Sequence, residues 1–498
     1  MAYLSEDKIA SIVDRVVSRL QDNDGGGAKR APYAPKAESR PSVRAESSSS
    51  GVASASAGRN RETGLRGVFL NLDEAIAANR VAYQQFSSLG LQARYAIIAA
   101  MRREAHQHVD AISKMAHEET GLGRVDQKVI KNRLVIDKTP GPEILDTFAT
   151  SGDDGLTIEE YAPFGVLGAI TPMTNPTETI ICNGIGMLAA GNAVCFNAHP
   201  KAKKCSAYTV DFLNKAIVAA GGPENLITCT AEPTIEIAQQ LMRHPGIALL
   251  VVTGGPGVVK EAMGSGKKCI AAGPGNPPVV IDETADLEQA ALGVVKGVGL
   301  DNNIVCVAEK EIIAVGAIAD KLKELMKRHG AYELTGDEIG RVEKVVMQGD
   351  GPNKKWVGKD AALILREAGI NAPQNTVIAY GEVPEAHPFV QHELLMPVTG
   401  LVRTANAREA IITAVRCEHG NGHTAAMYSK NIENLHTMAR ACNTSIFTKN
   451  VPTYAGLGLG GEGYCSFTIA SPTGEGLTTA RHFSRRRRCV LKDYFRIV

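Results

Sequence analysis

The 498-residue chain carries almost no net charge, because its 54 lysines and arginines are balanced by 53 aspartates and glutamates. We therefore expect no field strong enough to draw the whole chain to nucleic acid or to an anionic membrane. The sequence also has no uninterrupted apolar stretch of the roughly 18 residues that a membrane-spanning helix requires, and its N-terminus lacks the core of a signal peptide. These absences predict a soluble, cytoplasmic protein.

A disulfide framework or zinc ribbon is also missing, since the 10 cysteines are scattered and no two of them form a CxxC pair. We therefore expect reduced thiols. Three side chains of metal-binding type lie close together, but the glycines among them favour a turn, whereas His-x3-His spacing needs a helix to bind a metal. They are Cys417, His419 and His423. The sequence thus predicts no metal site.

Apolar residues at helical spacing, from Leu4 to Leu20, predict an amphipathic helix over residues 1–20. The next segment, 21–65, is rich in Gly, Ser, Ala, Pro and Arg and cannot bury enough apolar area to offset the entropy of ordering, which predicts a disordered linker. A lone short helix is only marginally stable in water, so we expect it to dock in an apolar groove of a partner. The alternatives are a helix that folds back on its own chain and a remnant of expression.

After the linker, helices are expected over 72–89 and 91–118, and then short apolar runs alternate with helical patterns. The expected strands are 164–171, 193–196, 226–228 and 247–253, and the expected helices between and after them are 178–190, 207–220, 235–243 and 258–263. This alternation predicts a doubly wound parallel sheet, which binds ligands at the carboxyl ends of its strands. Thr253 and Gly254 lie at such an end, where N–H groups of the next helix can meet a phosphate or ribose.

A second α/β region begins after about Gly273, with a strand expected at 278–281 and a helix at 286–297. Within it, Cys306 lies between a polar turn and the apolar strand 311–315. A thiol on a loop held by a rigid scaffold is a candidate nucleophile, although free cysteines are more often buried structural residues. A cleft between the two regions is the expected place for substrates to meet.

Three other patterns are interpreted as structural. Residues 456–461 fit GxGxxG, but no strand precedes them. Gly184 and Gly186 fall inside an expected helix, where they favour close packing. The basic run Arg485–Arg488 precedes apolar residues and predicts an exposed strand edge rather than a nucleic-acid site.

Five motifs in order resemble the aldehyde dehydrogenase superfamily over about residues 67 to 498. They are Ile170–Glu178, Val252–Gly255, Cys306 in its loop, Glu393–Val398 and Gly420–Ala425. Within this superfamily the chain is most similar to the coenzyme A (CoA)-acylating aldehyde dehydrogenases of bacterial microcompartments, which act on propionaldehyde or acetaldehyde. Residues 463–476 and 488–498 strengthen this resemblance.

The resemblance implies an α/β, aldehyde dehydrogenase-like fold with three parts. They are a Rossmann-like NAD-binding domain over 66–140 and 162–272, an α/β catalytic domain over 273–469, and a β-flap oligomerisation element from 141–161 and 470–498. It further implies a homodimer or homotetramer, and it implies that residues 1–20 bind a shell protein and place the enzyme in the microcompartment lumen.

The family also implies roles for individual residues. The Cys306 thiolate attacks the aldehyde, a hydride passes to NAD, and a thioester remains. Asn175 stabilises the oxyanion, although an ungapped alignment places Thr174 at that position. The residues matched to NAD binding are Thr171, Pro172, His199, Thr253, Gly254 and Glu393. His199 stands where relatives have a lysine that contacts the adenosine ribose, so we expect NAD rather than NADP. His423 is matched either to deprotonation of CoA or to packing.

One departure from the family pattern selects the reaction. Hydrolytic relatives activate water with a glutamate about thirty residues before the cysteine, whereas the matching stretch here, Ile270–Asn276, contains no carboxylate. Without that base we expect the thioester to pass to the thiol of CoA. The expected products from a short-chain aldehyde, NAD and CoA are acyl-CoA and NADH. The alternatives are a hydrolytic aldehyde dehydrogenase, a relative that reduces acyl phosphates, and a shell-binding scaffold without catalysis.

Overall fold

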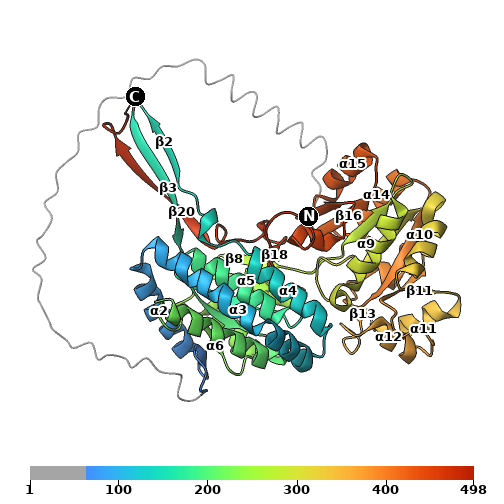
Figure 1. Cartoon of the computed structure of the whole chain (residues 1–498), viewed down its shortest axis with the longest axis horizontal. Coiled ribbons are helices and arrows are strands. Elements are labelled where there is room, and N and C mark those ends of the chain that lie inside the picture. The colour runs from blue at the N-terminus through green and yellow to red at the C-terminus, as the bar shows by residue number, and fades with distance from the viewer. Residues whose placement is uncertain (1–62, 498) are drawn as a thin grey trace, which may run out of the picture. The chain divides into compact units, whose positions relative to one another are not determined.

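The computed structural model describes residues 63–497. The helix expected over 1–20, and all but the last few residues of the expected linker 21–65, lie outside this range. None of the helices within it is long and apolar enough to cross a membrane. The described chain forms two large parallel sheets, a three-stranded antiparallel sheet and two short antiparallel strand pairs (Figure 1).

The first large sheet has six parallel strands in the order β1-β6-β5-β4-β7-β8. These strands are β1 (Val68–Phe69), β4 (Val166–Ile170), β5 (Ala193–Asn197), β6 (Ile227–Thr230), β7 (Leu249–Thr253) and β8 (Cys269–Ala272). Every residue of β4 and β5 is buried, as expected for central strands covered on both faces. The βαβ units predicted from the sequence are thus confirmed, with no strand end shifted by more than two residues.

Seven helices accompany this sheet: α2 (Leu72–Ser87), α3 (Leu91–Thr120), α4 (Val125–Lys138), α5 (Pro176–Ala189), α6 (Lys203–Ala219), α7 (Ile235–Arg243) and α8 (Pro256–Met263). Helices α5 and α6 pack against strands, and α3 packs over both of them, with α4 against α3 and α5. Gly186 in α5 has Phe483 so close that an added Cβ would lie 3.0 Å from its ring. The interpretation of the α5 glycines as packing positions is therefore confirmed.

The second large sheet has seven parallel strands in the order β11-β14-β15-β10-β9-β16-β17. They are β9 (Pro278–Ile281), β10 (Glu311–Val315), β11 (Ala331–Leu334), β14 (Ile378–Glu382), β15 (Val398–Thr404), β16 (Thr424–Tyr428) and β17 (Ile446–Lys449). Val279 packs with α9 (Leu287–Gly299) and α10 (Gly316–Arg328), whereas Val280 packs with α14 (Ala407–Cys417) and α15 (Ile432–Cys442). Successive side chains thus enter the cores on opposite faces of the sheet.

The shorter helices of this region are α11 (Asp337–Val346), α12 (Ala361–Glu367) and α13 (Pro388–Gln391). Two short strand pairs complete it. In the first, β12 (Met347–Gln348) pairs with β13 (Gly351–Pro352), and in the second, β18 (Ile469–Ala470) pairs with β19 (Gly476–Leu477). The GxGxxG pattern, residues 456–461, begins at the end of the 3-10 turn η4 (Thr453–Leu457) and continues through a left-handed Gly458. No helix follows at this place, so the pattern does not begin a dinucleotide-binding helix. Together the two parallel sheets confirm the predicted α/β, aldehyde dehydrogenase-like fold.

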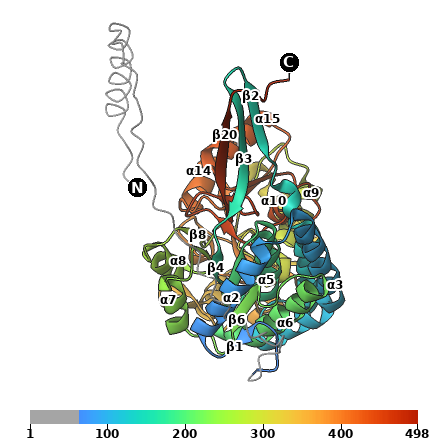
Figure 2. The same ribbon diagram turned by 90° about the vertical axis from the view of Figure 1, so that its left-hand side faces the viewer.

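The antiparallel sheet joins two distant parts of the chain, because β20 (Ser484–Lys492) pairs with β3 (Gly155–Pro163), which pairs with β2 (Phe148–Gly152). Both views show these three strands side by side (Figures 1 and 2). The arginines Arg485–Arg488 lie exposed on β20, and Arg488 pairs with Glu159 on β3. The predicted exposed strand edge is confirmed.

Close packing of α9 on the second sheet leads to a stability prediction. A Cβ at Gly293 would lie 2.0 Å from the hydroxyl oxygen of the buried Tyr428, so Gly293→Ala should lower the unfolding temperature, since such overpacking costs about 1–3 kcal/mol. Gly340→Ala in α11 is the matched control, because nothing lies within 4 Å of the added atom and helix propensity favours alanine by about 1 kcal/mol. Equal unfolding temperatures for Gly293→Ala and the natural protein would contradict the close contact.

Candidate active site

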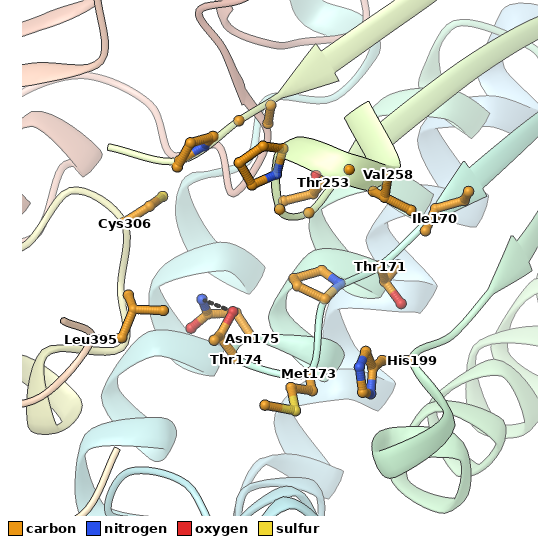
Figure 3. Close-up of a pocket in the computed structure, with 18 of the residues that line it drawn as sticks. Ile170, Thr171, Met173, Thr174, Asn175, His199, Thr253, Val258, Cys306 and Leu395 are labelled. Atoms are coloured by element: carbon orange, nitrogen blue, oxygen red, sulfur yellow. Dashed lines mark hydrogen bonds between the residues drawn. The ribbon is translucent and has the colours of Figure 1, made fainter. Parts of the chain in front are cut away.

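A cavity of about 1020 Å³ lies at the carboxyl ends of the strands of the first sheet. Residues at or just after the ends of β4, β5, β7 and β8 line it, as expected for a ligand site in an open parallel sheet. The Cys306 loop and the segment Glu393–Leu395 also line it. Eight of the nine predicted site residues meet here: Thr171, Pro172, Asn175, His199, Thr253, Gly254, Cys306 and Glu393. Figure 3 labels five of them, Thr171, Asn175, His199, Thr253 and Cys306.

The residues at the strand ends fit a dinucleotide. Thr171 Oγ1 and Asn197 Oδ1 are buried at the cavity and have no hydrogen-bond partner within residues 63–497, so both can bind ribose hydroxyls. Gly255, the N-cap of α8, has no side-chain cap, which leaves the first N–H groups of that helix for a phosphate. Apolar side chains on α7, Ala238 and Met242, offer contact for an aromatic base.

Two of the predicted NAD-binding residues are held by neighbouring groups. The Thr253 hydroxyl lies 2.9 Å from that of Thr468, which in turn lies 3.1 Å from Asn183 Oδ1. His199 accepts a hydrogen bond at Nδ1 from the N–H of Lys201 at 3.1 Å. Burial and then the charge of Lys201 lower the pKa of His199, so its imidazole is neutral at pH 7. It supplies no fixed positive charge to the cavity.

Cys306 follows the 3-10 turn η3 (Leu300–Asn303), and its half-buried thiol is directed into the cavity (Figure 3). Burial and then the carboxylate of Glu393 raise the pKa of the thiol to about 12, while the charge of Lys310 and the N–H groups of Cys306 and Val307 act in the opposite direction. The thiolate is therefore a minor species at neutral pH, and a strong nucleophile when it forms.

The loop before Cys306 has an uncommon backbone. Three successive residues, Asp301, Asn302 and Asn303, have φ of 45°, 56° and 66°, a left-handed conformation that asparagine and aspartate tolerate best. Asn303 Nδ2 donates to the carbonyls of Val298 at 2.8 Å and Glu309 at 2.9 Å. The Lys310 ammonium donates to Asn303 Oδ1 at 2.6 Å. These bonds hold the strained turn in place.

Both candidates for the oxyanion donor line the cavity. Asn175 precedes α5 and is buried, and its Nδ2 donates to Thr174 Oγ1 at 3.3 Å. Its Oδ1 accepts a hydrogen bond from Lys131 at 2.5 Å. In the view of Figure 3 the amide nitrogen of Asn175 lies on the side nearer Cys306. The Asn175 amide keeps a second N–H for an oxyanion, and the Thr174 hydroxyl, which accepts one bond, keeps its own proton to donate.

Two carboxylates line the cavity, Glu261 and Glu393. Glu261 pairs with Arg243 away from Cys306. Burial raises the pKa of Glu393 to about 7, and the charge of Lys310 and the N–H of Gly275 lower it. The stretch matched to the base of hydrolytic relatives contributes only Ala272, Gly273 and Pro274 to the cavity wall, so no carboxylate faces the thiol from that side.

His423 is the one predicted site residue that does not line the cavity. It is fully buried, its Nδ1 lies 2.8 Å from Thr424 Oγ1, and burial and then the charge of Lys310 lower its pKa to about 4. A Cβ on Gly275 would lie 2.9 Å from His423 Cγ and 3.0 Å from the Cys306 carbonyl oxygen. The imidazole thus packs behind the backbone of Gly275, and a direct role toward CoA would need this backbone to move.

Sequence reasoning missed the buried lysines that surround the site, Lys128, Lys131 and Lys310. The first two stand three residues apart on α4, on the same face as the buried Leu134 and Val135. Lysines within an apolar stripe are a signal of buried ion pairs, because an unpaired buried charge is unstable.

The electrostatic coupling of Cys306 to Glu393 leads to a pH prediction. Alkylation of Cys306 by iodoacetamide requires the thiolate, so its rate should rise about tenfold per pH unit between pH 7 and 9 without reaching a plateau. Glu393→Gln removes a neighbouring negative charge, which should lower the thiol pKa and raise the rate at pH 8 several-fold. Mass spectrometry of the Cys306 peptide separates this thiol from the exposed Cys489. A rate that is unchanged in Glu393→Gln would contradict the coupling.

Comparison with known proteins places this geometry in a family. The model of the "Aldehyde dehydrogenase family" matches residues 69–345. The acetylating acetaldehyde dehydrogenase EutE of Escherichia coli (strain K12) is 50% identical over 439 residues, which are 87% of this chain and 94% of that protein. The CoA-propanoylating propanal dehydrogenase of Citrobacter freundii is 45% identical over 432 residues, 86% and 94% of the two chains.

Comparison with solved structures gives the same result as comparison of the sequences. Rhodopseudomonas palustris propionaldehyde dehydrogenase, with bound CoA and an acylated cysteine, has a TM-score of 0.84 and 49% identity, covering 86% of this chain and 98% of that one. A propionaldehyde dehydrogenase from the Clostridium phytofermentans fucose utilisation bacterial microcompartment has a TM-score of 0.86 and 46% identity, covering 87% and 100%. The resemblance predicted from the motifs is confirmed, and the chain belongs to the aldehyde dehydrogenase family.

Proposed function

We propose that the protein is a CoA-acylating aldehyde dehydrogenase, which converts a short-chain aldehyde, NAD and CoA into acyl-CoA and NADH. The observation that carries the proposal is a cavity that contains the Cys306 thiol and has no carboxylate on the wall formed by Ala272, Gly273 and Pro274. The names of the acetylating and propanoylating relatives support it.

In the first half-reaction Cys306 loses its proton and its Sγ forms a bond to the aldehyde carbon. The carbonyl oxygen becomes an oxyanion, to which Asn175 Nδ2 and the N–H of Cys306 donate hydrogen bonds. When bound, NAD supplies the acceptor for the hydride that leaves the same carbon. The product on the protein is a thioester of Cys306.

The second half-reaction transfers the acyl group. The thiolate of CoA forms a bond to the thioester carbon, the bond from carbon to Cys306 Sγ breaks, and Cys306 is regenerated. The same N–H donors stabilise the oxyanion of this step. Water is a poorer nucleophile than a thiolate unless a base removes its proton, and hydrolysis would depend on Glu393, the carboxylate whose charge acts on Cys306.

The remaining site residues bind NAD in this proposal. Thr171, Pro172, Thr253 and Gly254 form the edge of the first sheet that faces the nicotinamide and its ribose, together with Glu393 on the opposite loop. His199 lies where the adenosine ribose is expected. The unpaired Thr171 Oγ1 and the uncapped N-terminus of α8 support this placement.

The proposal also covers location and assembly. Residues 1–20 bind a shell protein, 21–65 link this segment to the enzyme, and the protein works in the lumen of a bacterial microcompartment in the cytoplasm. The NAD-binding part is 66–140 with 162–272, and the catalytic part is 273–469. Segments 141–161 and 470–498 join subunits into a homodimer or homotetramer. The microcompartment origin of one structural relative and the exposed β2-β3-β20 sheet support these assignments.

The direct test measures NADH formation from propionaldehyde and NAD with and without CoA. We expect sustained turnover only with CoA, and we expect Cys306→Ala to lower the rate by about 10³-fold or more, because it removes the nucleophile. Cys269→Ala, at a partly buried thiol of β8 that does not line the cavity, should keep the rate of the natural protein. Sustained turnover of the natural protein without CoA would instead establish hydrolysis of the thioester.

A second test concerns the choice of coenzyme. Because the His199 imidazole is neutral at pH 7, we expect kcat/KM to favour NAD over NADP. His199→Lys places a cation at the adenosine ribose and should raise kcat/KM for NADP relative to NAD several-fold. Initial rates with both coenzymes measure the ratio. A natural protein that uses NADP as well as NAD would contradict the assignment of His199.

A further inference from the structure

Lys131 on α4 is almost completely buried, and three oxygen atoms surround its ammonium group. Its Nζ lies 2.5 Å from Asn175 Oδ1, 2.6 Å from Asp301 Oδ2 and 3.0 Å from Glu178 Oε1. An ammonium carries three protons and accepts no hydrogen bond. Lys131 therefore donates a hydrogen bond to Asn175 Oδ1 and forms ion pairs with two carboxylates, Glu178 in the first turn of α5 and Asp301 in the turn before Cys306.

This contact determines which way the Asn175 amide faces. Because Lys131 can only donate, the atom of the amide that faces it must be the oxygen. The nitrogen must then face the other way, toward Thr174 and the cavity. An oxyanion accepts hydrogen bonds, so it is stabilised by this orientation and repelled by the opposite one. Neither Thr174 nor a water molecule, each both donor and acceptor, would enforce that choice.

The same ammonium is bonded to the loop that carries the nucleophile. Asp301, five residues before Cys306, begins the strained left-handed turn, and its other carboxylate oxygen accepts the N–H of Arg124 at 2.6 Å. Lys128 Nζ, also on α4, lies 3.2 Å from Asp301 Oδ2. The carboxylate fits against the backbone of Gly123, where an added Cβ would lie 2.1 Å from Asp301 Oδ1.

The cluster is charged as well as buried. Burial opposes the charge of Lys131, but Asp301 and Glu178 outweigh it and raise the lysine pKa above its ordinary value. Lys131 and Lys128 in turn lower the pKa of Asp301 despite its burial. Two cations thus face two carboxylates, and removing one member leaves an uncompensated charge in the interior.

We infer that Lys131 is a positioning residue for catalysis, which fixes the Asn175 N–H toward the oxyanion and ties it to the loop of Cys306. The inference rests on the proposed function, because it assigns Asn175 as the oxyanion donor of that reaction. Lys131 itself touches no reacting atom. Its effect on the rate passes through Asn175, and this distinguishes it from a lysine that only stabilises the fold.

The test uses the full-length protein and p-nitrophenyl acetate, an ester that acylates a reactive thiol without NAD or CoA. Cys306 Sγ forms a bond to the acetyl carbon, the bond from that carbon to the nitrophenyl oxygen breaks, and nitrophenolate leaves with the electron pair. Lys131→Met keeps the length of the side chain but removes its charge and its donors. We expect it to slow acylation about tenfold or more, since losing one oxyanion donor costs roughly 10²–10³ in rate.

A double-mutant cycle with Asn175→Ala separates positioning from general damage. If Lys131 acts through Asn175, Lys131→Met should slow acylation hardly at all once Asn175 is absent. Lys128→Met is the matched control, on the same helix and equally buried, because Lys128 pairs with Asp301 without contacting Asn175. Lys128→Met should lower the acylation rate less than Lys131→Met does, and by the same factor whether or not Asn175 is present. Equal losses for Lys131→Met in both backgrounds would overturn the inference.

Two further measurements keep the result interpretable. Iodoacetamide reacts with Cys306 without forming an oxyanion, so the alkylation rate should change much less than the acylation rate in Lys131→Met. An equal fall in both rates would overturn the inference.

Should Lys131→Met fail to fold, the double variant Lys131→Met with Glu178→Gln restores the charge balance and enters the same cycle. The two proposals fail in different ways. If the natural protein is acylated by the ester but forms no NADH with CoA present, the proposed function is wrong. If Lys131→Met is acylated as fast as the natural protein, only this inference is wrong.

Discussion

The ion pair between Lys131 and Asp301 is the contact on which the active site depends. It joins α4, a helix of the first sheet, to the turn that carries Cys306 in the second α/β region. Three successive residues of that turn have positive φ, a strained conformation that persists only where surrounding contacts stabilise it. Breaking one partner of a buried ion pair costs about 3–5 kcal/mol. The turn before the thiol is thus held by two lysines from a distant part of the sequence, and Lys128 still pairs with Asp301 when Lys131 is replaced.

The same burial that makes these ion pairs strong makes the thiol a weak acid. The pKa of Cys306 is raised to about 12 by burial and by Glu393, so the free site stabilises the thiolate poorly until substrate contacts are made. Once the thioester forms, its fate depends on which nucleophile can reach it in a reactive state. The wall at Ala272, Gly273 and Pro274 offers water no base, whereas a thiol ionises far more readily than water does. This asymmetry favours transfer of the acyl group to CoA over its hydrolysis in the proposed reaction.

The strands that were predicted from the sequence, four in the first sheet and two in the second, are short apolar runs. Strands such as β4, β5 and β9 are buried on both faces, so their sequences are continuous apolar runs bounded by turn residues. The site residues were predicted from motifs, and those that follow strand ends meet because the carboxyl ends of parallel strands lie at one edge of a sheet.

The parts that were missed depend on contacts between distant residues. Helix α4 was not predicted, because Lys128 and Lys131 interrupt its apolar face, and their partner Asp301 lies 173 residues from Lys128. His423 was matched either to the CoA side or to packing, and a motif does not reveal which side of the Gly275 backbone its side chain occupies. Neither the ion pairs nor this packing leaves a local pattern in the sequence.

The most direct measurement of the central claim is the mass of the intact protein after mixing with propionaldehyde and NAD in the absence of CoA. We predict that one propionyl group accumulates on Cys306 with release of about one NADH per subunit, and that the added mass disappears when CoA is supplied and propionyl-CoA forms. Continuous NADH release with no added mass would show that water removes the acyl group and would contradict the acylating mechanism.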